Sequence, residues 1–172
     1  MSKIVTGKVR FSYVNVFEPR SMNESQEPKY SVCVIIDKKD KETLAKVNAA
    51  IEQTKEEFVE KWGGKILPNL KLALRDGDLD HPDREEFIGK FFLNCSSKNK
   101  PGVVDADTNP ILDKNEIYSG CYGRVSINFF PYNNNGNKGV AAGLNNLQKL
   151  ADGPRLAGGS SASEDFGGGL LD

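Results

Sequence analysis

The stretch 117–132 (IYSGCYGRVSINFFPY) constrains the fold most, because its residues alternate in character with a period of two. One set of alternate positions is apolar or small and includes Ile117, Cys121, Val125, Ile127 and Phe129. Successive side chains of a β-strand point to opposite faces of the sheet. The pattern therefore predicts a strand with this face in the hydrophobic core.

The opposite face of the same stretch carries aromatic rings around a guanidinium. Its members are Tyr118, Tyr122, Arg124, Ser126, Asn128, Phe130 and Tyr132. The solvent face of a half-buried strand usually carries ordinary polar residues, whereas rings stack on nucleobases and basic side chains meet phosphates. We predict that this face binds a flat, anionic ligand such as single-stranded nucleic acid. The alternative, a strand buried on both faces whose rings only pack, stays open for Phe130, which lies between Phe129 and Pro131.

Length and composition limit the class of protein. A chain of 172 residues suits one domain. Its longest apolar run, Val32 to Ile36, is far shorter than the roughly 18 residues needed to cross a bilayer, so we expect no membrane association and a cytoplasmic location. Three isolated cysteines indicate neither a disulfide framework nor a zinc site.

The net charge is −1, and Glu164, Asp165 and Asp172 follow the last basic residue, Arg155. The body is thus slightly basic and the tail acidic.

The remaining patterns predict more strands and one long helix. Strands are expected at 4–17, 30–36, 70–75 and 85–95, and 96–115 reads as a polar loop. Apolar residues recur at helical spacing through 41–62 between a capping Asp37 or Asp40 and Gly63-Gly64; they are Leu44, Val47, Ile51, Phe58 and Trp62. The segment 138–150 suits a bulged strand better than a helix, because Gly139 and Gly143 would weaken a helix.

Together these elements predict an all-β, β-rich fold: an OB-fold barrel of five to six strands with one inserted α-helix. The helix would close one barrel end, although a helix that binds a partner would show the same pattern. We expect residues 1–156 to form the domain. Residues 157–172, which are rich in Gly, Ser and acidic side chains, should form a flexible, disordered acidic C-terminal tail.

An acidic turn at 76–83 raises the question of an enzyme. Asp76, Asp78 and Asp80 follow the first part of a calcium-loop pattern, but His81 and Phe87 occupy positions that need Gly and Glu, so the match fails. A magnesium-dependent nuclease that uses these carboxylates is the alternative function. A solvated hairpin turn is the simpler interpretation. We therefore predict a non-enzymatic protein without catalytic residues, metal or cofactor.

Several ordered blocks resemble a known family. VRFSYVNVFEP, GKFFLNCSSKNKPGVVDAD, IYSGCYGRVSINFFPY and NKGVAAGLNNLQKLADG, followed by a tail that contains EDF, resemble phage-encoded single-stranded DNA-binding proteins with an OB fold. The resemblance covers residues 4–156. It implies a protein that coats unwound DNA without sequence preference during phage DNA replication or recombination. It supplies no residue-level map of the binding site.

The candidate binding residues therefore come from the faces of the predicted strands. They are Arg10, Tyr13, Lys98, Lys100, Tyr118, Tyr122, Arg124, Asn128, Phe130 and Tyr132. For Lys98 and Lys100 a solvated charge run is an equally good interpretation. In the tail, Glu164, Asp165, Phe166 and Asp172 are candidates for docking replication or recombination proteins, and for occupying the DNA groove when DNA is absent. A protein-interaction module of OB type, a solubilising tail and a homodimer all remain open.

Overall fold

The protein is strand-rich in the computed structural model, which describes residues 2–21, 27–66, 69–134 and 137–156. The strands are β1 (Ser2–Val5), β2 (Val9–Arg20), β3 (Lys29–Asp37), β4 (Lys71–Leu72), β5 (Leu74–Asp76), β6 (Lys90–Ser97), β7 (Gly102–Val104), β8 (Tyr122–Asn134) and β9 (Asn137–Ala151). The helices are α1 (Lys41–Glu57) and the single turn α2 (Gly77–Asp80), with 3₁₀ turns at Val59–Trp62, Glu85–Phe87 and Lys114–Glu116. Neither α-helix of the described ranges is long and apolar enough to span a membrane.

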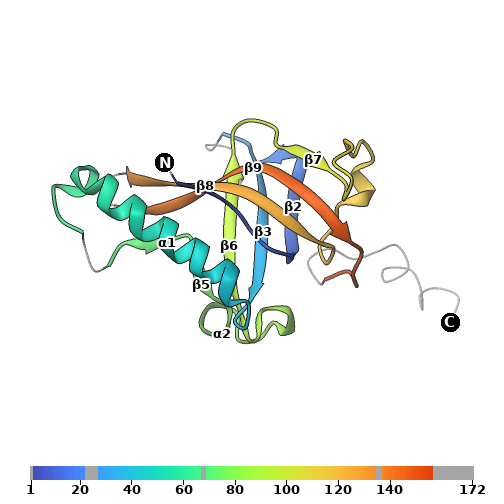
Figure 1. Cartoon of the computed structure of the whole chain (residues 1–172), viewed down its shortest axis with the longest axis horizontal. Helices are drawn as coiled ribbons and strands as arrows, with labels where there is room; N and C mark the ends of the chain where they lie inside the picture. The colour runs from blue at the N-terminus through green and yellow to red at the C-terminus, as the bar shows by residue number, and fades with distance from the viewer. Residues whose placement is uncertain (1, 22–26, 67–68, 135–136, 157–172) are drawn as a thin grey trace, which may run out of the picture.

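Five of the strands close into a ring. β3 pairs antiparallel with β2 on one side and with β6 on the other, and β6 runs parallel to β9. β9 forms a long antiparallel hairpin with β8, and β8 returns to β2. Figure 1 shows this hairpin running obliquely across the upright strands β2, β3 and β6. The prediction of an OB-type barrel with one inserted helix is confirmed.

The stretch 117–132 forms the inner wall of this barrel as predicted, but β8 begins only at Tyr122. Residues 117–121 form a turn in which Cys121 N–H donates to the Tyr118 carbonyl. The five apolar residues of the inner set, Ile117, Cys121, Val125, Ile127 and Phe129, are each at most 5% exposed. The opposite set is half-buried or exposed throughout, Phe130 included. The alternative of a strand buried on both faces is therefore wrong.

The first long strand departs from the expectation in two places. Residues 6–8 interrupt it, so that β1 pairs with residues 126–129 of β8, whereas β2 pairs with Tyr122 and Gly123 at the start of β8. Within β2 a bulge follows, since two residues between Ser12 and Asn15 lie opposite one residue of β3. Strict alternation would place Tyr13 with Phe11 in the core. The bulge instead brings Tyr13, with φ of 48°, to the outer face.

The helix α1 closes one barrel end. Asp40 caps it by accepting from Thr43 N–H at 3.2 Å, and its buried face, which includes Leu44, Val47 and Ile51, joins the core cluster of the barrel strands. The helix packs on β1, β8 and β9 (Figure 1). The strand expected at 138–150 is confirmed as β9, whereas β7 lies inside the segment expected to be a loop.

Candidate nucleic-acid interface

A groove of about 840 Å³ lies on the outer face of the barrel, where β2, β3 and β6 run side by side. Residues from these three strands and from the loops at their ends line it: Tyr13, Asn15, Arg20, Ser21, Glu27, Lys29, Ser31, Val32, Cys33, Asn94, Cys95, Ser96 and Lys98. Burial raises the pKa of the Cys33 thiol to about 12, so this residue stays neutral in the floor. The groove thus has a neutral floor and polar, partly basic walls.

Tyr13 lines this groove with 43% of its surface exposed. Its backbone N–H donates to Ser119 Oγ at 3.0 Å, which fixes the bulge that turns the ring outward. A non-glycine residue in the left-handed region is held there only where the surrounding structure supports it, and such residues gather at functional sites. The surrounding structure, including the bond to Ser119, therefore holds Tyr13 in a conformation that the residue itself disfavours.

The ring of Tyr13 begins a continuous array of rings and one guanidinium. Arg84 lies over the Tyr13 ring at 5.1 Å and over the Phe87 ring at 5.1 Å, and it donates a hydrogen bond to the Tyr13 hydroxyl. His81 follows, with its ring 4.6 Å from Phe87 and 5.1 Å from Phe92. Phe87 and Phe92 are buried, whereas Tyr13 is exposed and His81 half-buried. Of the rings in this array, those of Tyr13 and His81 are therefore accessible from solvent.

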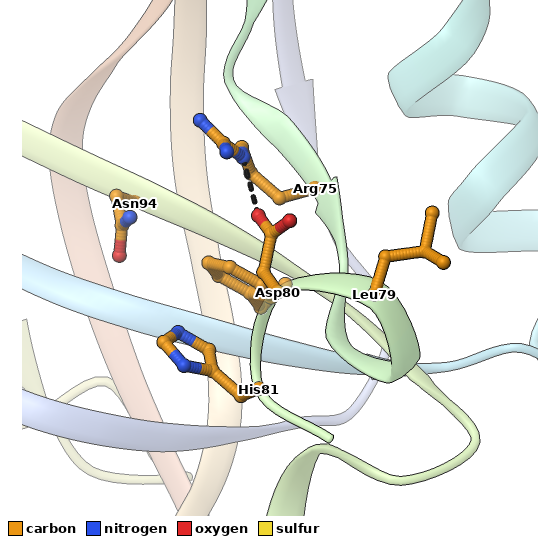
Figure 2. A pocket seen from close by; sticks show the side chains of 6 residues that line it. Arg75, Leu79, Asp80, His81 and Asn94 are labelled. Atoms are coloured by element: carbon orange, nitrogen blue, oxygen red, sulfur yellow. Dashed lines mark hydrogen bonds and ion pairs between the residues drawn. The ribbon is translucent and has the colours of Figure 1, made fainter. Parts of the chain in front are cut away.

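His81 lies in a second hollow of about 520 Å³, which continues the groove along β6 and shares Asn94 with it. In Figure 2 the side chains of Arg75, Asp80, His81 and Asn94 surround one space. Arg75 Nε donates to Asp80 Oδ2 at 2.6 Å, so the carboxylate at this end is balanced by a guanidinium. Over both hollows the lining residues comprise four cations, Arg20, Lys29, Arg75 and Lys98, and two carboxylates, Glu27 and Asp80.

Of the residues predicted from the sequence, Tyr13 and Lys98 line the groove. Lys98 is exposed and forms a loose ion pair with Glu27 at 3.5 Å. Lys100 lies elsewhere, with its ammonium 6.0 Å from the Phe17 ring. The structure thus brings only part of the predicted set together at one surface.

Arg10, Tyr118 and Tyr122 hold the segment 152–156 instead. Arg10 donates to the carbonyls of Gly120 at 3.1 Å and Pro154 at 2.7 Å, and its guanidinium lies over the Tyr122 ring at 5.3 Å. Tyr118 donates to Asp152 Oδ1 at 2.9 Å. Burial raises the pKa of Tyr118. A Cβ at residue 153 would lie 2.6 Å from the Tyr122 ring, so the backbone of this segment rests directly on that ring.

Arg124, Asn128, Phe130 and Tyr132 lie on the outer face of the β8–β9 hairpin, away from the groove. Arg124 donates to Gln148 on β9. Phe130 and Tyr132 pair with the small residues Ala141 and Gly139 across the hairpin. Their role in binding stays a prediction.

The carboxylates of the acidic turn are engaged with cations. Lys38 Nζ lies 2.8 Å from Asp76 Oδ1 and 2.6 Å from Asp78 Oδ2, and Asp80 binds Arg75. The hydrogen bond from Lys38 lowers the pKa of Asp78. In the described part of the chain, no group of three or more His, Cys, Asp or Glu residues could hold a metal ion. The carboxylates that the nuclease alternative would need are thus paired with Lys38 and Arg75.

Sequence reasoning missed His81, Arg84, Phe92 and Asn94. No local pattern connects His81, in an acidic turn, to Tyr13, because the two meet only through the barrel topology. Asn94 is an exposed polar residue between the buried residues Leu93 and Cys95 of β6. This alternation was the one sequence signal that could have identified Asn94 as an outward-facing residue. The tail candidates Glu164, Asp165, Phe166 and Asp172 lie outside the described residues.

Comparison with known proteins gives the family. Residues 2–171 match the family model described as "Enterobacter phage Enc34, ssDNA-binding protein". A putative protein p50 from Acyrthosiphon pisum secondary endosymbiont phage 1 is 33% identical, covering 95% of this chain and 92% of that protein.

Solved structures agree with this match. The single-stranded DNA-binding protein of bacteriophage Enc34, solved in complex with single-stranded DNA, superposes with a TM-score of 0.79 at 28% identity, over 89% of this chain and 88% of that chain. The single-stranded DNA-binding protein gp2.5 of bacteriophage T7 shares the fold, with a TM-score of 0.64 at 16% identity, over 98% and 94% of the two chains. The prediction of a non-enzymatic protein is confirmed by this family. The chain belongs to the family of the single-stranded DNA-binding protein of Enterobacter phage Enc34.

Proposed function

We propose that this protein coats single-stranded DNA, without sequence preference, during phage DNA replication or recombination, and that the strand lies in the groove across β2, β3 and β6. The observation that carries the site is the array from Tyr13 to His81, which presents the Tyr13 ring in the larger hollow, whose walls are partly basic, and the His81 ring in the smaller hollow. The Enc34 relative, solved in complex with single-stranded DNA, supports the ligand. The site of action would be the cytoplasm of the host cell.

Both base stacking on aromatic rings and phosphate contacts of basic side chains would contribute to DNA binding. Each stacked base contributes about 1–3 kcal/mol and is tolerated whatever its identity, because every base has a π-face. Tyr13 and His81 are the stacking partners, and the buried Phe87 and Phe92 fix the orientation of His81. Arg20, Lys29 and Lys98 would contact phosphates along the larger hollow.

A salt titration tests both the ligand and the site. Binding of labelled oligothymidine, measured by fluorescence anisotropy, should weaken as salt rises, with a log–log slope of about −0.7 for each neutralised phosphate. Lys98→Ala should make the slope shallower by about 0.7, because one phosphate contact is lost. Lys114→Ala is the matched control, since Lys114 has the same side-chain exposure and the same 3.5 Å ion pair, but outside the groove.

The two possible negative results lead to different conclusions. Wild-type protein without salt-sensitive binding would contradict the proposed function. Equal slopes for Lys98→Ala and Lys114→Ala would leave the function standing and remove Lys98 from the DNA path.

We also propose that residues 1–156 form the DNA-binding domain and that residues 157–172 form an acidic tail that docks partner proteins and competes for the groove. The position of Leu156 supports the competition. Its N–H donates to the Ser119 carbonyl at 3.0 Å, and its side chain packs beside Cys33, Phe87 and Phe92 on the outer face of β3 and β6. The tail would therefore leave the barrel beside the DNA groove.

Deleting residues 157–172 should tighten oligothymidine binding about fivefold at low salt, because three carboxylates no longer compete with phosphate at close range. The gain should disappear above roughly 0.3 M salt, where charges are screened. Replacing Glu164, Asp165 and Asp172 by their amides in the 172-residue chain removes the negative charges but keeps the tail. This variant therefore separates the effect of charge from the effect of steric bulk. An unchanged affinity for the deletion at low salt would remove the tail from the groove.

A further inference from the structure

The one-turn helix α2 is held in place by hydrogen bonds, ion pairs and close packing. The Asp76 side chain accepts from Asp78 N–H at 2.9 Å, and Asp78 Oδ1 accepts from Gly89 N–H at 2.9 Å. Lys38 bridges both carboxylates. Gly77 is buried so tightly that a Cβ there would collide with the Phe87 carbonyl oxygen. These contacts make a four-residue turn a rigid platform.

The side chain presented by this platform is Leu79, which is 78% exposed. It lines the rim of the smaller hollow, and Figure 2 shows it projecting from the turn away from His81. An isolated exposed leucine on a protein surface is ordinary. Leu79 differs because it is held on a rigid turn beside the hollow in which we propose that the DNA strand lies. Leu79 and His81 both line the smaller hollow, so a strand that extends through this hollow from His81 would reach Leu79.

We propose that Leu79 is a wedge that inserts between neighbouring bases at the end of the groove and so helps to open duplex DNA at a single-strand junction. Apolar side chains such as Leu, Ile and Phe do this in other DNA-binding proteins, where they unstack one base step. A wedge must be both exposed and rigid, because a mobile side chain would be pushed aside by the stacked bases. The inference rests on the proposed function, since the groove must first hold the single strand.

The test uses a DNA hairpin with an oligothymidine overhang long enough to fill the groove and a fluorescence donor–acceptor pair across the stem. The rate of stem opening is measured at saturating protein for the wild type, Leu79→Ala and Leu112→Ala. Leu112 is the matched control, because it is 91% exposed and lines neither hollow. Affinity for oligothymidine alone is measured in parallel. Both replaced side chains are exposed, so neither change should affect folding.

Leu79→Ala should slow stem opening about tenfold, the loss of roughly one unstacking contribution, while its affinity for oligothymidine stays within about twofold of the wild type. Leu112→Ala should match the wild type in both assays. Equal opening rates for the two variants would overturn the wedge, and so would a wild type that opens no stem. If Leu79→Ala lowered the affinity for oligothymidine alone by tenfold, the wedge proposal would be overturned, because Leu79 would then be an ordinary contact in the groove. A wild type that binds no oligothymidine would overturn the proposed function first.

Discussion

Replacing both Tyr13 and His81 with alanine is expected to weaken oligothymidine binding about 100-fold. Each ring would stack one base, and a loss of about 1.4 kcal/mol for each, within the usual range for base stacking, multiplies to this factor. Since Tyr13 is exposed and His81 half-buried, the fold should persist. Anisotropy titrations at fixed salt measure the effect, and near-ultraviolet circular dichroism checks that the variant is folded.

The matched control removes two rings from the other candidate surface. Phe130→Ala with Tyr132→Ala takes two half-buried rings from the outer face of the β8–β9 hairpin, and its affinity should stay within about threefold of the wild type. If this variant lost 100-fold and the Tyr13, His81 variant did not, the DNA path would follow β8, as the sequence first indicated. The comparison therefore decides between two surfaces of the same barrel.

Replacing Phe129 with alanine is expected to lower the free energy of unfolding by about 3–5 kcal/mol, the usual cost of a Phe-to-Ala change in a core. Phe129 is fully buried in β8, in the same cluster as residues of α1 and β9. This loss is a large fraction of the roughly 5–15 kcal/mol that stabilises a typical domain. Denaturation with urea, monitored by far-ultraviolet circular dichroism, measures it.

The neighbour Phe130 supplies the contrast. Because its ring lies half-buried on the opposite face, across from the small residue Ala141, Phe130→Ala should cost no more than about 1 kcal/mol. Equal losses for Phe129→Ala and Phe130→Ala would mean that both faces of β8 are core. That result would contradict the division of this strand into an inner and an outer face.

The barrel could be predicted from the sequence because its determinants are local. The alternation in 117–132 placed Ile127 and Phe129 inward correctly, and the helical spacing between Asp40 and Trp62 identified α1 within a few residues. Hydrophobic periodicity reports which face of an element is buried, and it does so without knowledge of neighbours. The number of strands and the single long helix then limited the architecture to a barrel.

The binding surface could not be predicted in the same way, because its parts are joined only by topology. The rings of Tyr13 and His81 are 68 positions apart in the chain and belong to one array only because β2, β3 and β6 pair in that order. The bulge that turns Tyr13 outward breaks the alternation on which the faces were assigned. The aromatic face of 117–132 was recognised correctly as unusual. However, Tyr118 and Tyr122 contact residues 152–156 of the same chain, which no local pattern reveals.

The measurement that tests the DNA path most directly is photo-crosslinking with oligothymidine in which single residues are replaced by 5-iododeoxyuridine. Irradiation joins this base to an aromatic side chain stacked on it, and mass spectrometry of the digested complex identifies that side chain. The proposed groove predicts crosslinks at Tyr13 and at His81, which lose their yield in Tyr13→Ala and His81→Ala respectively. Crosslinks confined to Tyr118, Tyr122, Phe130 or Tyr132 would contradict it and place the strand on the outer face of the stretch 117–132.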